Sequence, residues 1–318
     1  MIEKYYSGVI EQIYNRIGKE TRNIVMANYS NDFSIENLEV IRRYQSNEDN
    51  VFFAYSEFSY NTLVGAYEPF LDIICNMHRR FIGGSFDDFQ KECGVYYLHR
   101  QVLNSYYETG ECFREETVLL NEVAYEQRRM TMAIADMLKK LSEVKPLMIV
   151  INRFQMASKS SIETIKYLID NPCANIGIVL GVNAIVKGTD STVEVWDRIV
   201  ESLEDRSAIY YIGSAGPLKN NVKTTNDDEL YITMNFEQSI QEASNIMEFL
   251  DFEQARRGCR IIEHKLKFED AWIDEKSLRR FYMVYARTSV LLGEMSKAIE
   301  LTNEYKALIP ENDSEHYL

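Results

Sequence analysis

The sequence lacks the residue patterns that mark most metal, disulfide and nucleophile chemistry. Its five cysteines are widely spaced and form no CxxC pair, which predicts reduced and mostly buried thiols. Its four histidines, His78, His99, His264 and His316, have no metal-ligand spacing. The chain order suggests no Ser/His/Asp arrangement either. We therefore expect no metal site and no catalytic residues of these kinds.

Long apolar runs and an excess of basic charge are also missing. No segment has the length of a membrane span, and the first residues, MIEKYYSG, lack the apolar stretch of a signal peptide. These absences predict a cytoplasmic protein without a membrane partner. Asp and Glu number 49 against 35 Lys and Arg, a formal charge of −14 that repels phosphate backbones. Direct binding to nucleic acid is therefore not expected.

The 318 residues are 46% hydrophobic and 26% charged, which is typical of a globular chain with room for two domains. Short apolar runs alternate with amphipathic helical patterns through the first two thirds of the sequence. The runs of strand type are 23–27, 51–55, 147–151, 176–180 and 208–212. This alternation predicts an α/β fold with a parallel sheet.

The most informative stretch is 146–167, PLMIVINRFQMASKSSIETIKY, in which a buried strand leads into a turn and a helix. It resembles the Walker B segment of the STAND and AAA+ ATPases related to the large LuxR-type regulators. In that family two acidic residues follow the strand, the first holding Mg²⁺ and the second polarising the attacking water. Asn152 and Arg153 occupy these positions here. The resemblance therefore implies a P-loop fold that has lost its chemistry.

The loop after the first strand shows the same loss. When GxxxxGK[ST] is aligned from Ala27 to Ser34, only the hydroxyl of Ser34 remains. Asp32 places a carboxylate at the second glycine, and Phe33 places a ring at the lysine that meets the phosphates. The family's nucleotide-sensing arginine corresponds to Asn183. We therefore expect no nucleotide or other cofactor at these degenerate positions.

The resemblance implies a five-stranded parallel sheet in the order 5-1-4-3-2, flanked by helices, in a degenerate P-loop ATPase-like domain at 1–215. The polar, turn-rich residues that follow predict a linker at 216–235. Residues 236–318 read as helices whose small residues recur with a spacing that resembles tetratricopeptide (TPR) repeats. Within the first domain, 82–113 is a helical, tyrosine-rich insertion to which the sequence assigns no role.

These features favour a catalytically inactive pseudo-ATPase, not an enzyme, that acts as a scaffold in protein–protein interaction or regulation. A protein partner would bind through the helical repeats. A first alternative is a nucleotide-binding switch without hydrolysis, in which Ser34 and the adjacent helix N-terminus hold phosphate. A second is part of a STAND-type transcription regulator whose DNA-binding element lies outside this chain.

Overall fold

The computed structural model of this protein describes residues 2–30, 38–46, 50–59, 63–114, 122–183, 193–205, 208–213, 236–268 and 273–309. The chain divides into two compact units. Unit 1 comprises Met1–Tyr60, Tyr67–Arg100 and Arg128–Thr225, and unit 2 comprises Asn61–Ala66, Gln101–Gln127 and Asn226–Leu318. Unit 2 thus combines the predicted helical region 236–318 with two segments from within 1–215. The predicted linker, 216–235, lies outside the described residues.

The described part of unit 1 contains a five-stranded sheet in which every pairing is parallel. Its strands are β1 (Ile24–Tyr29), β2 (Phe52–Glu57), β3 (Leu147–Asn152), β4 (Ile176–Asn183) and β5 (Ile209–Ile212). Their order, β2-β3-β4-β1-β5, is the predicted order 5-1-4-3-2 read from the opposite edge, so that prediction is confirmed. Both β3 and β4 are buried along their whole length, as is typical of strands covered on two faces.

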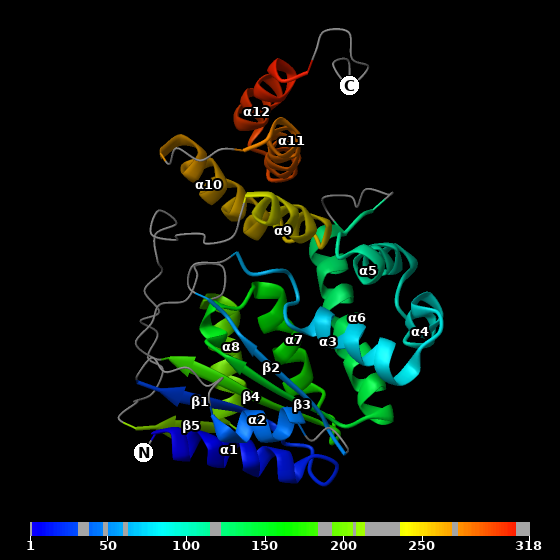
Figure 1. Cartoon of the computed structure of the whole chain (residues 1–318), viewed down its shortest axis with the longest axis vertical. Helices are drawn as coiled ribbons and strands as arrows, with labels where there is room; N and C mark the ends of the chain where they lie inside the picture. The colour runs from blue at the N-terminus through cyan, green and yellow to red at the C-terminus, as the bar shows by residue number, and fades with distance from the viewer. Residues whose placement is uncertain are drawn as a thin grey trace. The chain divides into compact units, whose positions relative to one another are not determined.

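Helices cover both faces of this sheet (Figure 1). On one face, α1 (Ile2–Arg16) and α2 (Glu39–Ser46) share a hydrophobic core with alternate residues of the strands. On the other face lie α7 (Lys159–Asp170) and α8 (Val193–Glu204). The buried stripe of α1 is Tyr6, Val9, Ile10 and Ile13, and Ile17, just after the helix, continues it.

Among the residues described between β2 and β3, four more helices are present. They are α3 (Phe70–Met77), α4 (Phe86–Glu92), α5 (Tyr97–Thr109) and α6 (Val123–Val144), with a π-helical turn at His78–Ile82. The division between the two units falls within α5 and near the start of α6. The predicted insertion 82–113 therefore contributes α4 to unit 1 and most of α5 to unit 2.

The end of α1 and the residue after it pack closely against Gly177 in β4. A Cβ atom at this position would lie 2.8 Å from the Cδ1 and Cγ1 atoms of Ile17 and 3.0 Å from Cγ2 of Ile13. Those distances are shorter than carbon atoms tolerate, so glycine allows the contact between helix and strand. Gly8, on α1 itself, has open space at its own Cβ position and makes a natural comparison.

We predict that Gly177→Ala destabilises the protein by about 1–3 kcal/mol, because two core isoleucines must move to admit the methyl group. Gly8→Ala serves as the control and should stabilise it by about 0.5–1 kcal/mol, because alanine has the higher helix propensity. The midpoint of urea unfolding measures both effects. If the two substitutions shift the midpoint in the same direction, the packing account of Gly177 is wrong.

In the described part of unit 2, four helices follow residue 235, in agreement with the helical pattern of the sequence. They are α9 (Phe236–Glu248), α10 (Phe252–Phe268), α11 (Glu275–Leu291) and α12 (Met295–Ala307). Small residues predicted to lie between paired helices, Ala243 and Ala255, are fully buried. A Cβ atom at Gly258 would lie 2.7 Å from Leu63 and 3.6 Å from the Cβ of Ala243. The membership of these helices in TPR repeats stays a prediction.

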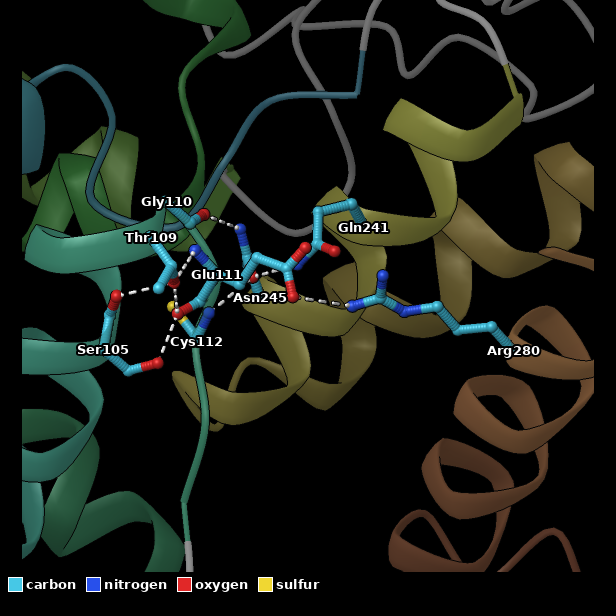
Figure 2. A network of polar contacts seen from close by, with 8 residues as sticks. All are labelled: Ser105, Thr109, Gly110, Glu111, Cys112, Gln241, Asn245 and Arg280. Carbon is cyan, nitrogen blue, oxygen red and sulfur yellow. Dashed lines mark hydrogen bonds and ion pairs between the residues drawn. The ribbon is translucent and has the colours of Figure 1, made fainter. Parts of the chain in front are cut away.

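A strap of five residues, 110–114, is tied to α9 within unit 2 (Figure 2). The side-chain oxygen of Asn245 accepts a hydrogen bond from the Cys112 N–H at 2.8 Å, and its amide nitrogen donates to the Gly110 carbonyl at 3.1 Å. Gln241 donates to the same Asn245 oxygen at 2.8 Å. One amide side chain thus holds the strap as a neighbouring strand would, by one donor and one acceptor.

The far end of the strap meets the C-terminus of α9. The Arg114 guanidinium donates to the Glu248 carbonyl at 3.1 Å, and the Glu248 carboxylate lies 3.3 Å from Arg287 on α11. Burial raises the pKa of Glu248 against the opposing effect of the two arginines.

Across the described ranges, no helix is both long enough and apolar enough to cross a membrane.

Candidate functional site

The carboxyl ends of the strands are where this fold would place a ligand, because open parallel sheets bind outside that edge. The pairing register aligns Glu57 with Asn152 and Tyr29 with Asn183 at this edge. Each of these four residues is the last of its strand. We define the strand-end cluster as Tyr29, Glu57, Asn152, Arg153, Gln155 and Asn183.

Asn152, which stands where the resembled ATPases have their metal-binding acid, is buried and hydrogen-bonded. Its Oδ1 atom accepts a hydrogen bond from the Tyr29 hydroxyl at 2.5 Å, and both side chains are fully excluded from solvent. Strand β4 lies between β1 and β3, so this bond connects two strands that are not neighbours. The amide oxygen that could approach a cation is therefore already used within the sheet.

Arg153, at the predicted position of the water-polarising acid, forms an ion pair. It adopts a left-handed backbone conformation with φ 54°, and its Nη1 atom lies 3.0 Å from the Glu57 carboxylate. The Tyr55 hydroxyl donates to the other oxygen of Glu57 at 2.5 Å. Both side chains of the ion pair are about one fifth exposed, which makes it a partly desolvated pair.

Tyr6 of α1 contacts the strand-end cluster through Tyr29. Its ring meets the Tyr29 ring edge-on, with centroids 6.1 Å apart. Burial raises the pKa of the Tyr6 hydroxyl well above its usual range. The Tyr29 and Tyr55 hydroxyls and the Glu57 carboxylate raise this pKa further. Tyr6 therefore stays protonated and neutral at physiological pH.

Gln155 links the turn after β3 to the end of β4. Its Oε1 atom accepts a hydrogen bond from the Asn183 backbone N–H at 3.3 Å. The Nε2 atom of Gln155 and the Nδ2 atom of Asn152 are buried, and neither has an acceptor among the residues that the structure describes. Two buried N–H groups without acceptors carry a desolvation penalty, so they are suited to an oxygen-bearing ligand or an ordered water.

The structure brings three of the predicted site positions together. Asn152, Arg153 and Asn183 all lie at the carboxyl edge of the sheet, as the sequence predicts. Ala27, the predicted first position of the loop, lies inside β1 and is buried opposite Gly181. Strand β1 continues to residue 29, beyond the predicted end at residue 27. The remaining loop positions, Asp32, Phe33 and Ser34, lie outside the described residues.

Sequence reasoning missed the partners of these positions. Glu57 follows the predicted strand 51–55 by two residues, and Tyr29 follows the predicted strand 23–27 by two. Both became strand ends because each strand runs two residues beyond its apolar core. Listing the polar residues just after each predicted strand would have identified Glu57 as a carboxylate beside Arg153.

Outside the strand-end cluster, the described metal-ligating and thiol side chains give little indication of metal or redox chemistry. Within the described ranges, His, Cys, Asp and Glu side chains form no group of three that could hold a metal ion. All five cysteines are free, and burial raises the pKa of Cys75 to about 12 and that of Cys93 to about 11.

Neither the protein-family models nor the curated proteins contain a match to this sequence.

We predict that Arg153→Ala destabilises the protein by about 1–3 kcal/mol, because Glu57 then remains partly buried without its cation. Adding Glu57→Gln to this variant should recover part of the loss, because a neutral amide replaces the unpaired charge. Arg22→Ala, an exposed arginine of the same unit, is the control and should change stability by less than about 0.5 kcal/mol. Chemical denaturation measures these three variants and Glu57→Gln alone, and strictly additive effects of the two substitutions would contradict the coupling.

Proposed function

We propose that unit 1 is a degenerate P-loop domain of the STAND and AAA+ type that does not hydrolyse nucleotide. In this proposal the whole chain is a pseudo-ATPase scaffold that acts in protein–protein interaction or regulation. The protein partner binds to the helices of unit 2. The proposal extends the resemblance of the sequence, and the strand-end cluster supports it.

The observation that carries the proposal is the pair of residues at the end of β3. Mg²⁺ requires anionic or strongly polar oxygen ligands, and water activation requires a base. Asn152 offers one amide oxygen, which Tyr29 already occupies, and Arg153 brings a positive charge that repels a cation. The chemistry of phosphoryl transfer has neither its metal anchor nor its base at this position.

Glu57 is the carboxylate within the strand-end cluster, and its contacts argue against a catalytic role. Arg153 pairs with one of its oxygens, while the Tyr55 hydroxyl donates to the other. Both of its oxygens are therefore engaged by neighbouring side chains. To act on a water molecule it would first have to lose the ion pair.

We predict that the purified protein releases no phosphate from ATP or GTP above a buffer blank in the presence of Mg²⁺. The degenerate loop and the end of β3 give the physical reason, because both lack the charges that hold the metal–nucleotide complex. Ser34→Ala is the control variant, because it removes the one hydroxyl retained from the phosphate-binding motif. Turnover that follows the protein peak and disappears in Ser34→Ala would overturn the proposal.

One observation favours the nucleotide-binding switch as a second candidate. The buried N–H groups of Asn152 and Gln155 lack acceptors among the described residues, and phosphate oxygens could accept from them. Against this, Asp32 adds a negative charge near the phosphates and Phe33 replaces the lysine, each at a cost of about 1 kcal/mol or more.

Calorimetric titration separates the scaffold from the switch. The scaffold proposal predicts no saturable heat from ATP or ADP with Mg²⁺, both for the native chain and for Phe33→Lys, since Asp32 and the missing glycines still oppose the phosphates. A saturable signal that Asn152→Leu abolishes, in a variant that remains folded, would establish the switch instead.

A further inference from the structure

Helix α11 carries a stripe of residues in which basic and apolar side chains are mixed. In chain order these residues, which we call the α11 stripe, are Lys276, Arg280, Met283, Arg287 and Val290. They are separated by four, three, four and three positions, so at about 3.6 residues per turn they share one face of the helix.

The α11 stripe is exposed in the structure. Met283 is 46% exposed and Val290 45% exposed, and the side chains of Arg280 and Arg287 are 39% and 51% exposed. The opposite face of α11 is buried within unit 2 through Phe281, Val284, Tyr285, Thr288 and Ser289. Single exposed apolar residues are common on proteins. On α11, two exposed apolar residues share one helix face with three basic residues, so this face combines apolar and positively charged positions.

Three of the five stripe residues are basic, in a chain that is strongly acidic. Helix α11 has four basic residues and one acidic residue, and the neighbouring α10 has five basic and two acidic, whereas the whole chain has a formal charge of −14. The contact of Arg280 with Glu111 of the strap is long, at 3.6 Å, and both side chains are exposed (Figure 2). Such a pair is worth little, so a partner carboxylate can replace Glu111.

We propose that the α11 stripe binds an acidic amphipathic helix of a partner protein, an inference that rests on the partner-binding role given to unit 2 above. Apolar side chains of the partner pack on Met283 and Val290, which are one heptad and about 10.5 Å apart along the helix. Carboxylates on the flanks of that partner helix meet Lys276 and Arg280, while Arg287, which lies 3.3 Å from the Glu248 carboxylate, adds its positive charge to the same face.

The apolar positions distinguish this partner from nucleic acid. A phosphate backbone satisfies cations but offers no apolar surface to Met283 and Val290. The net charge of −14 also repels a long polyanion such as nucleic acid. A short acidic helix contacts only the residues of the α11 stripe and their immediate neighbours. The pattern of the stripe therefore fits a helix with one apolar face and acidic edges.

The test uses the full chain and a fluorescein-labelled synthetic peptide of about 18 residues, with leucine at heptad spacing, glutamate beside each leucine and alanine elsewhere. Fluorescence anisotropy should show saturable binding that weakens as NaCl rises from about 50 mM to about 300 mM. A peptide of the same composition in scrambled order should bind at least about tenfold more weakly, because its apolar and acidic faces are lost.

A stripe variant and a matched control locate the binding surface. The stripe variant, Lys276→Glu with Met283→Ser and Val290→Ser, should weaken binding at least about tenfold. The control, Lys4→Glu with Met295→Ser and Ile299→Ser, makes the same charge change and removes the same number of exposed apolar residues elsewhere. It should bind as the native chain does, and equal unfolding midpoints should show that both variants remain folded.

Several results would overturn this assignment. They are the absence of saturable binding to the native chain, equal binding by the stripe variant, tighter binding to duplex DNA or to phosphatidylserine vesicles than to the peptide, and a dimer that the stripe variant abolishes. The last would assign the stripe to a second copy of this chain. Failure with the peptide leaves the absence of phosphate release intact, and phosphate release by the native chain would overturn the pseudo-ATPase proposal while leaving the peptide result unchanged.

Discussion

Parallel pairing brings the carboxyl ends of all five strands to one edge of the sheet, and this constraint decides which polar side chains can meet. The register that aligns Glu57 with Asn152 also sets Arg153, the next residue, beside the Glu57 carboxylate. In the same way, the end of β1 presents the Tyr29 hydroxyl to Asn152. The strand order and register therefore determine which side chains form the strand-end cluster.

Two contacts tie residues 152 and 153 to their neighbours at that edge. The Tyr29 hydroxyl donates to the amide oxygen of Asn152, and the Arg153 guanidinium pairs with Glu57. These contacts link the ends of β1, β2 and β3.

The order of the sheet could be predicted because each strand is an apolar run with polar ends, such as 147–151, and because the resemblance supplies the connectivity. The placement of Asn152, Arg153 and Asn183 at one edge followed from it. Their partners were missed, since the strands extend two residues beyond their apolar cores. The strap was also missed, because Asn245 reaches a segment more than 130 residues away through hydrogen bonds that leave no periodic pattern.

The proposal depends on whether the end of β3, with Asn152 and Arg153, can hold a metal ion. Electron paramagnetic resonance of Mn²⁺, titrated with the native protein and a non-hydrolysable ATP analogue, tests it most directly, because Mn²⁺ occupies Mg²⁺ sites and reports its own binding. The account predicts that the protein leaves the spectrum of the Mn²⁺–nucleotide mixture unchanged. Stoichiometric, nucleotide-dependent binding of Mn²⁺ by the native chain would contradict it.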